Sequence, residues 1–397
     1  MAKVITCQNI FAATLFLLVS CGFFSIPLIA EGEARAAPAN NSATSAAIAE
    51  YQRKLLEYNR QRKQYEDQAV AYWNSVSEKR RLRNQKRRDN QDILLDDYVL
   101  TQPPVYSGPP EPVNPSIVQP ERPPKTYIPV AADLLKAADE HFNFVPERPQ
   151  TEQQYKQRYA KAASAAGLTR DQAVRIYAFE CGGNGTYDVQ AGLEYRKPGA
   201  KAISTALGYN QLLTTNSIEL LAEQGDEIVK TLSARAKELS GEARGVLELK
   251  ITRLKRMISF TKTVPDDWNE HQKLADTPQG LGIHALNFDI DVGPLLQTQK
   301  LLNSIVFARR KGVQRMLTAA ELEMMNLTGD GNGFDMVTMP SAIRDKVPTS
   351  NFFLRSGYER NSVAIRNNVV AKLIATVDAR MNQETQLQGA RDLASYF

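Results

Sequence analysis

Ten prolines fall between Gln102 and Val130, and they divide the chain of 397 residues into two unequal parts. Proline fixes the backbone φ angle and removes a hydrogen-bond donor, so a segment this rich in proline is extended and builds no core. We therefore expect a proline-rich linker over residues 101–130. A domain boundary near residue 130 follows, and we expect the longer C-terminal part, residues 131–397, to be one domain.

The part before the linker has the pattern of a long helix. Residues 45–82 contain neither Gly nor Pro, and we expect a helical segment over residues 44–100. Tyrosines recur along it at intervals of seven, with apolar residues at the four-residue offset between them. The tyrosines are Tyr51, Tyr58, Tyr65 and Tyr72. Arg62 interrupts this seam, so two interpretations stay open: self-association as a coiled coil, or a single solvated helix.

A run of seven basic side chains over residues 79–88 is followed at once by Asp89, Asp92, Asp96 and Asp97. Charge blocks of opposite sign that follow one another favour a solvated helix. A patch that contacts a membrane or a glycan is the alternative.

The N-terminus has the composition of an export signal over residues 1–36. Lys3 precedes an apolar stretch from Ile10 to Ala30, and small residues follow at 34–37. A retained membrane anchor is an alternative, and Leu18–Cys21 matches a lipoprotein cleavage box. Each interpretation places the remaining chain in the periplasm or cell envelope. The net charge of +5 suits an anionic wall or membrane surface, and nothing in the sequence indicates a nucleic-acid partner.

Residues 131–397 show helical periodicity without an alternating strand pattern, so we expect a mainly α fold. The clearest helix begins after Thr169, which forms a capping box with Gln172, and ends before Gly182-Gly183. Glu180 lies on its apolar face in the last turn. Burial and the helix dipole both favour a protonated carboxyl there, which is the condition for a proton donor near neutral pH. The alternative is a glutamate that reaches solvent.

A second segment, Gly208–Leu213, reads Gly-Tyr-Asn-Gln-Leu-Leu and precedes another helix. Together with Glu180-Cys181 it resembles the lysozyme-like superfamily of soluble lytic transglycosylases and goose-type lysozymes. There a catalytic Glu, commonly followed by Ser, ends a helix, and Gly-Leu-Met-Gln comes a few tens of residues later. The resemblance covers roughly residues 165–230.

The sequence also departs from this family pattern. Cys181 stands in place of the usual Ser, and residues 187–192 lengthen the interval between the two motifs. The third family motif, Ala-Tyr-Asn followed by Gly, has its best counterpart in residues 285–294, which keep Ala285 and Asn287 but lack the Tyr. Gly357–Asn361 is a weaker counterpart.

The resemblance implies cleavage of peptidoglycan between N-acetylmuramic acid and N-acetylglucosamine, with Glu180 as general acid and then base. Lytic transglycosylation needs no second carboxylate, whereas hydrolysis does. Asp188 is the first choice for that second carboxylate, and Asp289 and Asp291 are the next. The expected substrate-binding residues are Gln211, Asn210, Tyr209, Tyr187 and Asn287. No cofactor is expected.

Other site chemistries are weaker. Cys181 with His271 and His284 has the order of a cysteine peptidase, but a helix C-terminus opposes a thiolate. The histidines are too scattered for a metal site, and Asp330–Asp335 is expected to be a turn rather than a calcium loop. The alternative function from another class is a catalytically inactive protein that binds peptidoglycan or serves as an envelope scaffold.

Overall fold

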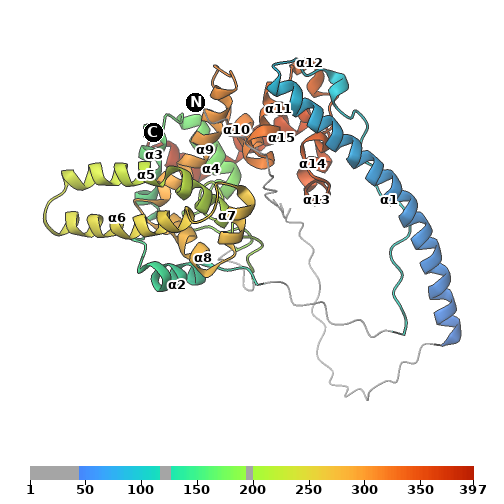
Figure 1. Ribbon diagram of the computed structural model, residues 1–397, viewed down its shortest axis with the longest axis horizontal. Coiled ribbons are helices and arrows are strands. Elements are labelled where there is room, and N and C mark those ends of the chain that lie inside the picture. The colour runs from blue at the N-terminus through green and yellow to red at the C-terminus, as the bar shows by residue number, and fades with distance from the viewer. Residues whose placement is uncertain (1–43, 117–126, 194–199) are drawn as a thin grey trace. The chain divides into compact units, whose positions relative to one another are not determined.

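The computed structural model describes residues 44–116, 127–193 and 200–397, and within these residues the protein is mainly α-helical (Figure 1). Its β-structure consists of isolated bridges. The expectation of a mainly α fold is therefore confirmed. The expected export signal lies outside the described residues. Within the described part, no helix combines the length and the apolar character that a membrane crossing requires.

The chain divides into two compact units, and each is built from two separate stretches. Of the described residues, unit 1 contains those within Tyr127–Ser341 and Ala371–Phe397, and unit 2 contains residues 44–116 together with Ala342–Val370. A boundary at Tyr127 is close to the expected one. The single domain expected over 131–397 is wrong in one respect, because residues 342–370 belong with the N-terminal helix.

Unit 2 is organised along one helix, α1 (Ser45–Arg88), with short elements packed against it. These are η1 (Leu95–Asp97), η3 (Thr349–Phe352), α13 (Arg355–Arg360) and α14 (Ser362–Arg366), and α12 (Ser341–Arg344) stands at the unit boundary. Tyr72 shares a hydrogen bond of 2.6 Å with Ser350, and the Trp73 ring lies 5.7 Å from the Tyr358 ring. Residues nearly 300 positions apart thus form one core.

The tyrosine seam of α1 is covered by the chain's own proline-rich segment. The Tyr106 ring lies 5.5 Å from the Tyr65 ring and 6.2 Å from the Tyr58 ring, both edge-on. The first part of the expected linker is therefore docked on α1 instead of spanning free space. Residues 117–126, its later part, lie outside the described residues.

Two arginines of the basic run are buried, which corrects the expectation of a fully solvated helix. Arg83 is fully buried, and its guanidinium donates to the Asp97 and Asn351 carbonyls at 2.9 and 3.2 Å. Arg80 donates to the Asn351 and Phe353 carbonyls at 3.1 and 2.7 Å. Planar guanidinium groups suit this role, because each offers several donors in a fixed geometry.

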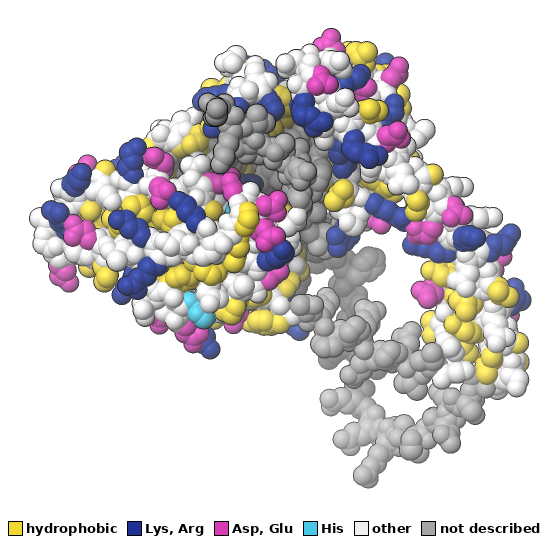
Figure 2. Space-filling model, viewed as in Figure 1, with side chains coloured by type: hydrophobic (Ala, Val, Ile, Leu, Met, Phe, Trp, Pro, Cys, Tyr) yellow, Lys and Arg dark blue, Asp and Glu magenta, His cyan; other side chains and the backbone are white. Residues whose placement is uncertain are grey.

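Unit 1 surrounds one aromatic and aliphatic core. Its helices are α2 (Ala131–Phe142), α3 (Glu152–Ala165), α4 (Arg170–Cys181), α5 (Thr214–Glu238), α6 (Gly241–Thr261), α7 (Trp268–Ala275), α8 (Pro278–His284), η2 (Ala285–Phe288), α9 (Gly293–Arg310), α10 (Ala319–Thr328), α11 (Asp330–Thr338), α15 (Val370–Glu384) and α16 (Gln388–Ala394). The long helices α5 and α6 form a hairpin (Figure 1). Figure 2 shows charges of both signs interspersed over this hairpin, as on an ordinary solvated surface.

The segment Asp330–Asp335 is helical, so the expected turn is wrong. It opens α11, and Gly333 brings this helix onto the backbone of α10. A Cβ atom at Gly333 would lie 2.3 Å from the Met325 Cα atom. The glycines that suggested a turn therefore serve close helix packing.

Replacing Arg83 tests whether this buried guanidinium holds unit 2 together. Arg83→Met removes the donor of the Asp97 carbonyl and one of the two donors of the Asn351 carbonyl, and we expect the free energy of unfolding to fall by about 2–4 kcal/mol. Urea unfolding followed by Trp73 fluorescence, in a Trp268→Phe background, measures the loss. Arg81→Met, at an exposed position of the same helix, is the control. Equal stability of the two variants would contradict the assignment.

Candidate active site

Helix α4 delivers Glu180 into the interior of unit 1. The expected capping box is confirmed: Gln172 N donates to Thr169 Oγ1 at 3.1 Å, and Thr169 N donates to Gln172 Oε1 at 3.0 Å. The helix ends at Cys181, and Gly182 follows with a left-handed φ of 58°. Glu180 is only 8% exposed. The solvent-directed alternative is thus excluded for this side chain.

The neighbours of Glu180 come from α10. Asn326 Nδ2 donates to Glu180 Oε1 at 2.8 Å, and the carboxyl of Glu323, which is fully buried, lies against that of Glu180. Glu180 Oε2 and both Glu323 oxygens receive no hydrogen bond from another described residue. Two ionised carboxylates can only accept hydrogen bonds, so a hydrogen bond between Glu180 and Glu323 requires a proton on one of them.

The electrostatics of this pair favour the neutral acids. Burial, and then the adjacent Glu323, raise the pKa of Glu180 well above its ordinary value of 4.5, while Asn326 and the charge of Arg380 oppose the shift. Burial likewise raises the pKa of Glu323 to about 8. A carboxyl in a dry site beside another carboxyl holds its proton at neutral pH, and that is the state a general acid requires.

The two sequence motifs meet directly. The Cys181 thiol, next to Glu180, donates to the Gly208 and Tyr209 carbonyls at 3.3 and 3.4 Å. The loop after α4 also pairs with the segment before Gly208, because Gly208 N donates to the Val189 carbonyl at 2.9 Å. The residues that lengthen the interval between the motifs therefore lie against the second motif.

The turn at Gly208–Gln211 has a strained and specific backbone. Gly208 has φ 78°, and a Cβ atom there would lie 2.5 Å from Gln297 Nε2. Gln211 has φ 45°, although it is not a glycine. Its Nε2 donates to the Gly208 carbonyl at 2.8 Å and to the Val189 carbonyl at 3.2 Å. A left-handed backbone at a residue other than glycine, as at Gln211, costs about 1–3 kcal/mol, and such residues concentrate at functional sites.

Three of the expected substrate-binding residues lie inside the core. Tyr209, Asn210 and Asn287 are at most 1% exposed. Asn210 N donates to Gln297 Oε1 at 2.7 Å, and Gln297 Nε2 donates to Asn287 Oδ1 at 2.8 Å. The second motif and the counterpart of the third are thus joined through Gln297. This geometry gives the three side chains the role of positioning the loop instead of a direct contact with sugar.

The Tyr209 ring anchors this turn in an aromatic cluster. It meets the rings of Tyr155, Tyr159 and Tyr177 edge-on at centroid distances of 5.1, 5.1 and 4.6 Å. Its hydroxyl donates to Glu152, whose own pKa is raised by burial. Tyr177 belongs to α4, so the cluster fixes the turn relative to the helix that carries Glu180.

Tyr187 and Asp188 are both bound by Arg148. The Arg148 guanidinium donates to the Tyr187 hydroxyl at 2.8 Å and to Asp188 Oδ2 at 2.6 Å. Thr186 Oγ1 donates to the other Asp188 oxygen at 2.7 Å. The expected second carboxylate is therefore already occupied by a cation and a hydroxyl, in contrast to Glu323.

Asp289 and Asp291 form a separate buried ion cluster. Lys250 Nζ lies 3.1 Å from Asp289 Oδ2 and 2.7 Å from Asp291 Oδ2, and Arg235 also binds Asp291. Asp289 further accepts from the backbone N–H of Glu147 at 2.9 Å. These aspartates tie loops together, as buried charges with matched partners do.

Sequence reasoning missed Glu323 and Asn326. They stand three residues apart on α10, a helix whose other side chains are buried. Glutamate is rarely buried without a partner, so a lone acid in the apolar stripe Leu322–Met325 was the available signal. Only the fold, however, brings it to Glu180.

The alternative chemistries gain no support. Burial, and then the charge of Glu180, raise the pKa of the Cys181 thiol, which opposes a thiolate nucleophile. Burial lowers the pKa of His284 to about 4, and its ring is bound between Ser217 and the Thr205 carbonyl. Within the described residues no group of acidic, His and Cys side chains has the arrangement of a metal site.

The carboxyl pair predicts a pH-dependent stability. Its folded-state pKa values lie above those of the unfolded chain, so the folded state binds more protons, and its contribution to stability is lost as pH rises from about 4.5 to 8. In Glu323→Gln this fall becomes smaller by about 1 kcal/mol or more. Urea unfolding at a series of pH values measures it. The control is Glu248→Gln, at an exposed position of α6, and its stability should depend on pH as that of the unmodified protein does. If the stability of Glu323→Gln also has the same pH dependence as the unmodified protein, the pairing is refuted.

No family model matches this chain, and neither a curated protein nor a solved structure matches it.

Proposed function

We propose that unit 1 cleaves peptidoglycan glycan strands by lytic transglycosylation, with Glu180 as general acid and base. The observation that carries this proposal is the buried Glu180 carboxyl, held protonated at the end of α4 and next to the strained Gly208–Gln211 turn. The order of Glu180-Cys181 and Gly208–Leu213 is the one that the resemblance to lysozyme-like domains implies, and the Cys181 thiol joins the two motifs. Tyr209, Asn210 and Asn287 position the turn, and Gln211, which is 6% exposed, stabilises it through its hydrogen bonds to the Gly208 and Val189 carbonyls.

The proposed reaction needs only one carboxyl in contact with the sugar. Glu180 gives its proton to the glycosidic oxygen, the bond to C1 of the muramic acid breaks, and the ring gains oxocarbenium character. The resulting Glu180 carboxylate takes the proton of the 6-hydroxyl as that oxygen bonds to C1. The products are a free 4-hydroxyl and a 1,6-anhydro ring, and Glu180 has its proton back.

Glu323 supports the charged intermediate state in this scheme. A protonated Glu323 donates a hydrogen bond to Glu180 when that carboxyl has lost its proton, and its pKa near 8 keeps it protonated at neutral pH. Inverting hydrolysis instead needs two carboxyls separated by roughly 6.5–9.5 Å with water between them. Glu323 lies directly against Glu180, and Asp188 is bound by Arg148. Both facts favour the lytic reaction.

The remaining chain fits an envelope protein in this proposal. The leader exports the chain or anchors it in the membrane, and peptidoglycan is the partner of unit 1. Tyr106 packs on the tyrosine seam of α1, at Tyr58 and Tyr65. This contact favours a single helix covered by its own chain over self-association through that seam.

A second candidate function is a catalytically inactive protein that binds peptidoglycan or acts as an envelope scaffold. The observation that favours it is the depth of the carboxyl pair, since Glu180 Oε2 and both Glu323 oxygens are buried. A scaffold would bind the polymer and leave it intact, so one digestion experiment separates the two functions.

Glu180→Gln keeps the shape of the side chain and removes its proton. We expect glycan-strand cleavage to fall by about 10²–10⁴-fold, as for loss of a general acid. Purified peptidoglycan is digested, and the 1,6-anhydro products are measured by mass spectrometry. Glu238→Gln, an exposed residue of α5, should retain full activity. Equal cleavage by Glu180→Gln would end the proposal; an intact polymer that still binds the unmodified protein would establish the scaffold.

Asp188→Asn separates lytic from hydrolytic chemistry. Because Arg148 and Thr186 already occupy this carboxylate, we expect less than about a tenfold loss of cleavage and an unchanged share of 1,6-anhydro products. Product analysis as above is the measurement. A loss comparable to that of Glu180→Gln, with reducing ends as the products, would make Asp188 the base of a hydrolase.

A further inference from the structure

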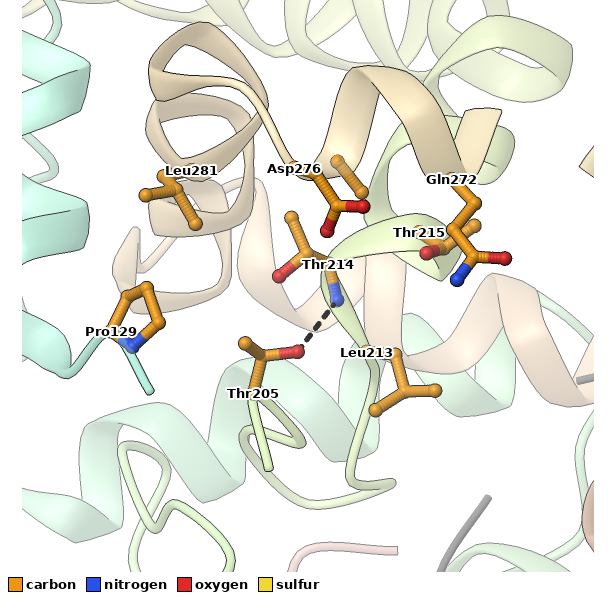
Figure 3. Close-up of a pocket in the computed structure, with 9 residues that line it drawn as sticks. Pro129, Thr205, Leu213, Thr214, Thr215, Gln272, Asp276 and Leu281 are labelled. Atoms are coloured by element: carbon orange, nitrogen blue, oxygen red, sulfur yellow. Dashed lines mark hydrogen bonds between the residues drawn. The ribbon is translucent and has the colours of Figure 1, made fainter. Parts of the chain in front are cut away.

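A cavity of about 380 Å³ opens in unit 1 at the N-terminal end of α5. In Figure 3, Asp276 and Thr214 lie next to each other in the middle of the view, Pro129 and Leu281 lie on one side of them, and Gln272 lies on the other. These residues come from the segment before α2, from α5, from α7 and its end, and from α8. Convergence of a few polar groups and apolar walls from separate elements is typical of a small-molecule site.

The hydroxyl of Thr214 is an unused polar group in the wall of this cavity. Thr214 is 4% exposed, and its Oγ1 has no hydrogen-bond partner among the described residues. Its backbone N–H donates to Thr205 Oγ1 at 3.3 Å, which fixes the Thr205 hydroxyl beside it. A buried hydroxyl without a partner is unfavourable, so a ligand that supplies one gains binding energy.

The charges around the cavity select a neutral ligand. Among the described residues the lining contains no Lys or Arg, and the Asp276 carboxylate repels a phosphate or carboxylate. The first turn of α5, which lines the cavity at Thr214, carries the positive end of the helix dipole and disfavours a cation. The cavity offers threonine hydroxyls, the Gln272 amide and the Asp276 carboxylate. These groups can form hydrogen bonds with a neutral ligand that carries several hydroxyl and amide groups.

We propose that this cavity binds one N-acetylated sugar unit of a glycan strand, with the apolar side at Pro129 and Leu281 under a sugar face. Thr205 precedes Gly208 by three residues, so at about 3.3 Å per residue the cavity lies within roughly 10 Å of the turn that contacts Cys181. It thus serves as a distal subsite. This assignment rests on the proposed function for its choice of polymer, but its binding does not require catalysis.

The test uses the full chain carrying Glu180→Gln, so that sugar is bound and not cleaved. Isothermal titration with tri-N-acetylchitotriose measures affinity. Thr214→Val removes the hydroxyl at nearly constant shape, and Asp276→Ala removes the exposed carboxylate at the rim. We expect each to weaken binding by about three- to tenfold, as for one hydrogen bond. Thr231→Val, on an exposed turn of α5, is the matched control and should bind as before.

Unchanged affinity in both cavity variants, or no binding of the trisaccharide, overturns the proposal. If Thr214→Val does not fold, as judged by circular dichroism, the surface variant Asp276→Ala decides alone. Inorganic phosphate, an anion, and cadaverine, a diamine cation, are titrated as well. The choice of ligand is overturned if either binds more tightly than the trisaccharide and if that binding is lost in Asp276→Ala or Thr214→Val. If chitotriose binding depends on this cavity but the unmodified protein leaves peptidoglycan intact, the sugar site is supported and the proposed enzymatic function is overturned.

Discussion

The side chain of Gln297 is the constraint on which the proposed site depends. Its Nε2 donates to the Leu207 carbonyl and to Asn287 Oδ1, and its Oε1 accepts from the backbone N–H of Asn210. One amide thus joins the turn at residues 207–210 to Asn287 and to its own helix α9, and a Cβ atom at Gly208 would lie 2.5 Å from its nitrogen. The carbonyl of Gly208 in this turn also accepts a hydrogen bond from the Cys181 thiol. An internal hydrogen-bond network therefore fixes the position of Glu180 relative to the loop.

Unit 1 buries acidic groups in two contrasting ways. Asp289 and Asp291 are matched by Lys250, so they join loops as charged groups. Among the described residues, Glu180 and Glu323 have each other and the Asn326 amide but no hydrogen-bonded cation, and burial raises the pKa of both towards the protonated form. The first arrangement is complete in itself. The second stores two transferable protons in one place, which is costly for stability and useful for chemistry.

Local patterns predicted local structure well. The capping residues of α4, its glycine stop and the long helix before the prolines all follow from nearest-neighbour physics, and the structure has them. What the pattern could not show depends on distant partners. Glu323 meets Glu180 across 143 positions, and Arg80 is buried by a carbonyl 271 residues away. Hydrophobic periodicity predicts which face of a helix is buried, but it does not predict which part of the chain packs against that face.

The division of both units into two stretches has a consequence for how the chain reaches its native state. Helix α1 can form as soon as it is made, yet its packing partners at residues 342–370 are synthesised only after all of Tyr127–Ser341. The core of unit 1 likewise requires α15 and α16, which follow those partners. Neither core can form before these later residues are made, and such high contact order slows folding. Losing residues 342–397 would therefore damage both cores at once, whereas a deletion of this length within one domain of an ordinary two-domain protein damages one.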